Sequence, residues 1–341
     1  MMKKGIVSLV LMLSCVFVSA NDLIQQAKDA GLAPLPKNQK EVEAILKQNG
    51  IKMSPFSEAK AELGKKLYLE PRLSASGVIS CNTCHNLGLA GIDGVEAAIG
   101  HKWSFNPHHL NSPTVYNSVL NATQFWDGRA KDLKEQAKGP IQDEDEMAAP
   151  QSLAVQRIAS IPEYVNEFKK AYGSGVTFDN IADAIAQFER TLLTPSRFDD
   201  FMRGKANALN AQEKEGLKLF IDKGCVSCHS GANLGGSMQA FEVAAKYKFA
   251  NVGDFKGDKN GMVKAPTLRN VAETAPYFHN GKIWSLQEAI KEMGRIQLDI
   301  KLSDKETQTI EAFLRTLTGK KPTVTYPQLP NSTPKTPKPK P

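Results

Sequence analysis

The sequence predicts a mainly α-helical protein of two domains, with few or no β-strands. Three observations support this prediction: apolar residues recur at helical spacing in several segments, alternating strand patterns are scarce, and one short Cys/His motif occurs twice. The two copies of the motif begin at Cys81 and Cys225, in different halves of the 341-residue chain. This separation favours one copy in each of two domains over a single tandem cluster.

Three segments show the clearest helical pattern. Residues 303–319 open with a capping box, in which a Ser and a Glu three positions later satisfy each other's backbone N–H groups. Residues 285–294 begin in the same way, and Met293 then lies on their apolar stripe. Residues 180–193 form a third amphipathic segment. We therefore expect a helix at each of these places.

The first twenty residues have the pattern of a secretory signal peptide. Lys3 and Lys4 precede an apolar run from Ile6, and small residues end at Ala20, after which we expect cleavage. A retained membrane anchor is the alternative, but the apolar run is short and no basic flank follows it. No other apolar run is long enough to span a membrane. The sequence therefore predicts export to a bacterial periplasm, with no membrane span in the mature chain.

The formal net charge of +7 comes from the two ends of the chain. Two lysines lie in the predicted signal peptide, and five more, with no acidic residue, lie in residues 320–341. The body between them is close to neutral, so the charge gives no evidence for nucleic-acid binding. The last residues are rich in Pro, Thr and Lys, which favours an extended C-terminal tail.

The repeated motif is C-x-x-C-H, the attachment signature of c-type haem. Its copies are Cys81-Asn-Thr-Cys84-His85 and Cys225-Val-Ser-Cys228-His229. In such a site both thiols form thioether bonds to the porphyrin, and the imidazole binds the iron. Thioether formation also explains how four thiols persist in an oxidising compartment. A four-cysteine zinc site is the alternative, but it requires no histidine directly after each pair. We therefore predict two covalently bound haem c groups.

The helix before each motif also repeats, as GKKLY in residues 64–68 and GLKLF in residues 216–220. Pro195 and Gly204 interrupt the helical pattern between the two units. The expected domains are a signal peptide at 1–20, an N-terminal haem domain at 21–195, a C-terminal haem domain at 196–320, and the extended C-terminal tail at 321–341.

The C-x-x-C-H pattern does not identify the second axial ligand of either iron. The candidates are Met238, Met262 and Met293 for the second haem, and His101, His108, His109 and Met147 for the first. Periodicity alone favours Met293 as a core residue. The segment 86–100, which precedes His101, contains four glycines, so its backbone can wrap round a haem edge and rearrange easily.

In these motifs and several others, the chain resembles the bacterial di-haem cytochrome c peroxidases, which are periplasmic enzymes that reduce hydrogen peroxide to water. The matching motifs include IGHKW, NSPTVYN, QFWDGRA, LKEQAKGPI, PTLRNV, TAPYFHNG and WSLQEAI. The resemblance runs from about Ser54 to the end of the chain. It implies two cytochrome c-like haem domains and a homodimer.

The resemblance also implies roles for individual residues. His85 and His101 would be the axial ligands of a peroxidatic, low-potential first haem, and His229 and Met293 those of a high-potential electron-transfer haem. Trp126 matches a tryptophan between the haems, and Gln136 and Glu146 match polar groups over the peroxidatic iron. Asn111, Thr274 and Pro276 match the protein ligands of a calcium ion.

These implied roles lead to a mechanistic hypothesis. Reduction of the second haem would release His101 from the first iron, where peroxide then binds. Glu146 would act as acid and base, Gln136 would orient the peroxide, and Trp126 would couple the haems. Electrons would come from a small cytochrome c or a blue-copper protein. The alternatives are a non-catalytic di-haem electron carrier, and a related enzyme that modifies a partner protein. The related quinone-cofactor maturation enzymes place a tyrosine where this chain has Met293.

Overall fold

The computed structural model describes residues 19–241 and 244–340. The predicted signal peptide lies outside these residues except for Ser19, which caps the first helix, and Ala20, which begins it. The α-helices are α1 (Ala20–Asp29), α2 (Gln39–Gln48), α3 (Glu58–Tyr68), α4 (Cys81–Cys84), α5 (Leu133–Gln142), α6 (Gln151–Ala159), α7 (Pro162–Tyr172), α8 (Phe178–Glu189), α9 (Arg197–Met202), α10 (Ala211–Asp222), α11 (Leu286–Leu298) and α12 (Asp304–Arg315). In the described part of the chain, no helix is long and apolar enough to cross a membrane.

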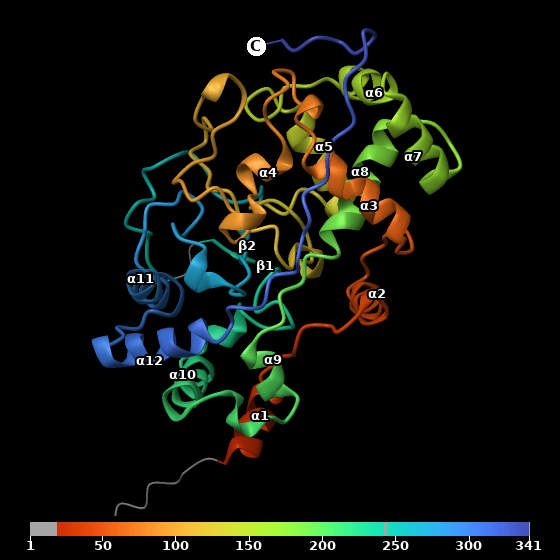
Figure 1. Ribbon diagram of the computed structural model, residues 1–341. Helices are drawn as coiled ribbons and strands as arrows, with labels where there is room; N and C mark the ends of the chain where they lie inside the picture. Colours follow the sequence, from red (N-terminus) through yellow and green to blue (C-terminus); the bar gives the residue numbers. More distant parts are fainter. Residues whose placement is uncertain (1–18, 242–243, 341) are drawn as a thin grey trace, which may run out of the picture.

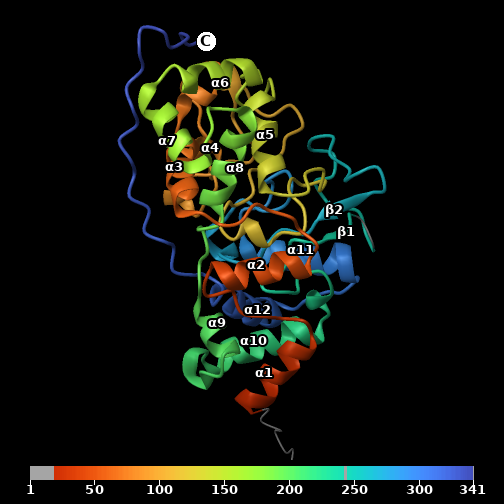
Figure 2. The same cartoon turned by 90° about the vertical axis from the view of Figure 1, so that its right-hand side faces the viewer.

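The prediction of a mainly α-helical fold is confirmed. Strands β1 (Met238–Ala240) and β2 (Met262–Lys264) form one short antiparallel pair, in which Met238 lies opposite Lys264. Helices α3 and α5 to α8 gather at one end of the molecule, and α9, α10 and α12 lie at the other (Figures 1 and 2). Each group surrounds its own apolar core.

Glycines allow the repeated helices to approach their neighbours closely. Helix α3 packs against α8, where a Cβ added to Gly64 would lie 1.8 Å from the carbonyl oxygen of Ala184. Helix α10 packs against α12, where a Cβ on Gly216 would lie 2.1 Å from the carbonyl oxygen of Thr309. Only a residue without a side chain fits such contacts. The glycine that begins each of the GKKLY and GLKLF repeats therefore has the same packing role in both halves.

The N-terminal helix packs with the second half of the molecule. Leu23 and Ile24 of α1 belong to the same buried cluster as Phe198, Phe201 and Leu217. Both views show α1 beside α9 and α10, far from α3 and α8 (Figures 1 and 2). The limits of the two domains at 21–195 and 196–320 remain a prediction.

The C-terminal tail is extended and returns to the first half of the molecule (Figures 1 and 2). The buried guanidinium of Arg157 donates to the carbonyl oxygens of Pro337 (3.1 Å) and Lys338 (2.8 Å). The backbone N–H of Lys340 donates to the carbonyl of Ala75 at 2.8 Å. The same guanidinium also donates to the Ala75 carbonyl at 3.0 Å. The tail is thus hydrogen-bonded along its last residues instead of being simply solvated.

Candidate active site

Both C-x-x-C-H motifs open onto one large, mostly apolar cavity, which we call the shared cavity. Cys81 and Cys84 reach it from α4, and Cys225 and Cys228 from the short 3-10 turn that follows α10. All four thiols are free, without a disulfide. The fold thus places the two motifs, which lie in different halves of the chain, in the wall of the same cavity.

Each motif fixes its imidazole in the same way. Nδ1 of His85 donates to the carbonyl of Pro113 at 2.9 Å, and Nδ1 of His229 donates to the carbonyl of Leu234 at 3.2 Å. Such a bond sets the tautomer and leaves Nε2 free as a metal ligand. Burial lowers the pKa of both histidines, so both rings are in the neutral form that binds iron.

The surroundings of the thiols fit haem better than zinc. Burial in apolar surroundings raises the pKa of Cys84 to about 12 and that of Cys225 to about 11. Among the described residues, no group of three or more Cys, His, Asp or Glu side chains is arranged to hold a metal ion. Paired thiols and a fixed neutral imidazole, beside an apolar cavity, are the donor set that covalent haem requires. The described residues thus offer no three- or four-ligand zinc site, which favours haem over the zinc alternative.

The shared cavity distinguishes among the candidate axial ligands. Of the three methionines considered for the second haem, Met293 on α11 lines the cavity, and Met238 and Met262 do not. On the side of the first motif, Met147 lines it. His101, His108 and His109 are not among its lining residues. His108 is instead bonded to Asp254 at 2.9 Å.

His101 lies on a loop whose backbone is locally strained. It begins a short 3-10 turn, and the next two residues, Lys102 (φ 58°) and Trp103 (φ 56°), have left-handed backbone angles. Nδ1 of His101 is buried and has no hydrogen-bond partner among the described residues. A Cβ on the preceding Gly100 would lie 1.8 Å from the carbonyl oxygen of Asp145. The His101 loop therefore contacts the segment that carries Glu146.

Gln136 and Glu146 both line the shared cavity. Gln136 is held on α5, and Glu146 follows that helix in a tight turn in which its N–H donates to the carbonyl of Asp143 at 3.1 Å. Burial, helped by the nearby Asp143, raises the pKa of Glu146 to about 7, although Arg129 acts in the opposite direction. A carboxyl group with this pKa both gains and loses a proton near neutral pH.

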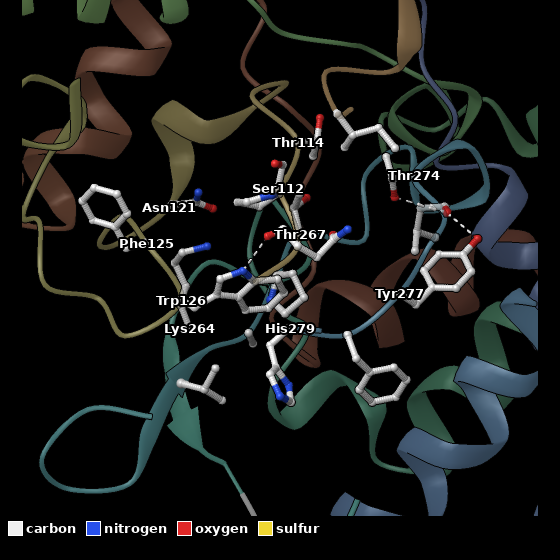
Figure 3. Close-up of a pocket in the computed structure, with 18 of the residues that line it drawn as sticks. Ser112, Thr114, Asn121, Phe125, Trp126, Lys264, Thr267, Thr274, Tyr277 and His279 are labelled. Atoms are coloured by element: carbon white, nitrogen blue, oxygen red, sulfur yellow. Dashed lines mark hydrogen bonds between the residues drawn. The ribbon is translucent and has the colours of Figure 1, made fainter. Parts of the chain in front are cut away.

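Trp126 and the three predicted calcium ligands also line the shared cavity. The indole N–H of Trp126 donates to the carbonyl oxygen of Asn111 at 2.9 Å (Figure 3). The side-chain nitrogen of Asn111 donates to the carbonyl of Val95 at 2.7 Å. Thr274 and Pro276 reach the cavity from the segment before α11. These contacts link the tryptophan to one proposed calcium ligand directly.

Two buried charged residues in the cavity wall were not predicted. Lys264 is 3% exposed, at the end of β2. Glu189, at the end of α8, is 5% exposed, and burial raises its pKa to about 8. Glu189 falls inside the predicted helix 180–193, and Lys264 follows two apolar residues. Neither position could be recognised as buried from the sequence, because each side chain is covered by parts of the cavity wall that are distant in the chain.

A mainly helical protein with two haem-attachment sites at one cavity defines the class of di-haem c-type cytochromes. Comparison with protein families supports this class: the model of the di-haem cytochrome c peroxidases matches residues 58–207, and that of cytochrome c matches residues 213–318.

Curated relatives define the family. The chain is 47% identical to a cytochrome c551 peroxidase of Pseudomonas aeruginosa, over 97% of this chain and 96% of the relative. It is 49% identical to a cytochrome c551 peroxidase of Nitrosomonas europaea, over 85% of this chain and 89% of the relative. It is 32% identical to the methylamine utilization protein MauG of Methylorubrum extorquens, over 82% and 84%. The chain belongs to the di-haem cytochrome c peroxidase family.

Among solved structures, a MauG-like protein associated with microbial copper homeostasis superposes with a TM-score of 0.68 at 28% identity, over 78% of this chain and 91% of the other. The Y463M variant of the di-haem peroxidase BthA from Burkholderia thailandensis has the same fold, with a TM-score of 0.65 at 20% identity, over 79% and 88%. The protein is therefore an oxidoreductase of the cytochrome c peroxidase type with two c-type haems.

Proposed function

We propose that the protein reduces hydrogen peroxide to water in the periplasm, with electrons delivered by a small cytochrome c or a blue-copper protein. The observation that carries this proposal is Glu146, a carboxyl group with a pKa of about 7 in the wall of the cavity that also holds the first haem motif. The names of the relatives, cytochrome c551 peroxidases, support a small cytochrome as donor.

Glu146 has the properties of a proton carrier for this reaction. The haems, when bound, supply iron centres that exchange one electron each, and the reduction of one peroxide needs two. The carboxylate form of Glu146 accepts a proton from the bound peroxide and then gives it to the departing oxygen, so that water leaves instead of hydroxide. The amide of Gln136 holds the peroxide by hydrogen bonding. Trp126 lies in the wall of the cavity that both motifs line, and it would couple the two haems.

His101 controls access in this proposal. Its ring would bind the first iron in the resting protein and would leave it once the second haem is reduced, which opens that position to peroxide. The left-handed residues after His101 and the buried, unbonded Nδ1 support a loop that has two arrangements. Contact of Gly100 with the Asp145 carbonyl makes the position of Glu146 sensitive to the loop.

Removal of the His101 ring tests this control. We expect His101→Gly to react with peroxide in the fully oxidised state, whereas the unmodified protein reacts only after one haem has been reduced. Stopped-flow absorption of oxidised and half-reduced samples measures the difference. His108→Gly is the matched control, because His108 is an exposed histidine of the same loop. A His101→Gly protein that still requires reduction would contradict the proposed control.

Two further features belong to the proposal. A calcium ion would bind at Asn111, Thr274 and Pro276, partly through carbonyl oxygens, which are ligands that calcium accepts. The resemblance to the peroxidases also supports a homodimer. Removal of calcium by a chelator, followed by sedimentation and by peroxide turnover, tests both features together.

A further inference from the structure

Lys264 is a buried cation in the wall of the shared cavity. It ends β2, and its backbone N–H donates to the carbonyl oxygen of Trp126 at 2.7 Å. Its side chain lies beside the Trp126 indole, with the ammonium group directed towards Asn121 (Figure 3). The distance from Nζ to the centre of the Trp126 ring is 6.0 Å, the outer limit of a cation–π contact. The aromatic ring alone therefore compensates this charge only weakly.

Other buried cations in the described part of the chain have partners. Arg269 pairs with Asp199 at 2.9 Å, Arg190 pairs with Glu43 at 3.1 Å, and Arg157 donates to several carbonyl oxygens. For Lys264, burial is the only influence on the pKa of the ammonium group, and no hydrogen-bond or charged partner among the described residues acts on it. Burial without compensation lowers the pKa of Lys264 to about 8. An ammonium group without a partner in the wall of a mostly apolar cavity is costly, so this wall favours an anionic occupant of the cavity.

The shared cavity limits the identity of that partner. Arg129, the other lysine or arginine in its lining, is half exposed and already pairs with Asp127 at 2.9 Å. Asn121, towards which the ammonium group points, is a neutral amide that is bonded to Gln124 and Asn233. A haem c brings two propionate carboxylates into such a cavity, after its vinyl groups have been consumed by the cysteines.

We propose that Lys264 binds a haem propionate through its ammonium group at the junction of the two haem sites, beside Trp126. The positive charge compensates the propionate and stabilises the reduced state of that haem, so Lys264 is a positioning residue that sets a potential. The carboxylate comes either from the first or from the second haem. The proposal rests on the presence of two haems but does not depend on peroxide turnover.

Equilibrium redox titration of the holoprotein tests this role. We expect Lys264→Met to lower the midpoint potential of one haem by about 59 mV or more, which is a tenfold decrease in its equilibrium constant for reduction. The haem whose midpoint falls is the one that carries the bound propionate, and a fall in both assigns one propionate from each. Lys259→Met is the matched control, because it removes an exposed lysine from the same β-hairpin.

A conservative variant distinguishes charge from packing. Lys264→Arg keeps the positive charge and should keep both midpoints near those of the unmodified protein, and it remains decisive if the Met variant does not fold. Unchanged midpoints in Lys264→Met, or an equal fall in Lys264→Arg, would overturn the proposal. If the midpoint falls as expected in Lys264→Met but the unmodified holoprotein does not turn over peroxide, the proposed function fails and the role of Lys264 stands. The haem content of every variant is measured first.

Discussion

The two halves of the molecule share one attachment unit but differ in what faces it. Each half has a helix that packs closely on its neighbour through a glycine, a C-x-x-C-H motif, and a histidine whose imidazole is hydrogen-bonded to a carbonyl oxygen. Near the first motif lie a loop with left-handed residues and Glu146, whose pKa is raised to about 7. Near the second lies the regular helix α11, where Glu292 pairs with Arg295 at 2.8 Å and therefore has a lowered pKa.

In the proposed function, this difference assigns peroxide chemistry to the first haem and electron storage to the second. A carboxyl group that titrates near neutral pH moves protons, whereas one held by a guanidinium stays charged and inert. In the proposed function, the first haem has its ligand His101 on a loop that is easily displaced, and the second has Met293 in the middle of helix α11, which holds it in place. The same attachment unit would then serve two purposes because its surroundings differ.

The largest expected effect concerns Glu146. Glu146→Gln removes the proton carrier and keeps the shape, so kcat for peroxide should fall about 10²- to 10⁴-fold with unchanged haem content. The carboxylate is the active form of the free enzyme, so kcat/KM should fall as the pH drops through about 7. The variant should lack this pH dependence. Steady-state oxidation of a reduced cytochrome measures both.

The control for this variant is Glu144→Gln, which changes an exposed carboxylate in the same acidic run. It should leave both the rate and the pH profile unchanged. If the two variants behave alike, the contrast between Glu146 and Glu292 has no catalytic meaning.

An intermediate effect is expected at Met293. A thioether ligand raises the potential of a haem relative to a second imidazole. Met293→His should therefore lower the equilibrium constant for reduction of the C-terminal haem about a hundredfold, about 120 mV for one electron. Spectroscopic redox titration measures this change. Met262→His is the control, because Met262 does not line the cavity, and an equal shift in both variants would rule out Met293 as the ligand.

The smallest effects are expected at the repeated glycines. Gly64→Ala and Gly216→Ala each force a methyl group into a backbone carbonyl of the neighbouring helix, at a cost of about 1 to 3 kcal/mol in the free energy of unfolding. Thermal unfolding of the holoprotein measures the loss as a lower Tm. Gly175→Ala should be neutral, because no atom lies within 4 Å of its added Cβ. Unequal costs at Gly64 and Gly216 would show that the two halves are not packed alike.

Local signals in the sequence predicted the helices and the haem motifs well. The side chain of Ser303 accepts from the N–H of Glu306 at 3.2 Å and Glu306 accepts from the N–H of Ser303 at 2.9 Å, as the capping-box pattern indicated. At α11 only half of the predicted box forms: Ser285 accepts from the N–H of Glu288, and the carboxylate of Glu288 does not bond back. Such signals act within one turn of a helix, so the sequence contains all the information they need. The two haem motifs and the motifs around them were also sufficient to predict the family, and the curated relatives confirm that prediction.

Features that depend on distant contacts were beyond sequence reasoning. The burial of Lys264 depends on Trp126, which lies far away in the chain, and the need for glycine at 64 depends on Ala184. The position of the His101 ring depends on how its loop lies against Asp145, which spacing does not encode. The roles of Glu146, Gln136 and Trp126 remain predictions, although all three line the shared cavity.

The return of the C-terminal tail has a consequence for biosynthesis. Arg157 in the first half of the molecule takes its last hydrogen-bond acceptors from Pro337 and Lys338, and Ala75 takes its donor from Lys340. A ribosome makes the first of these partners 180 residues after Arg157, when the second half of the molecule has already been translated. The half of the molecule that is synthesised first therefore cannot complete its own hydrogen bonds until the second half has been made.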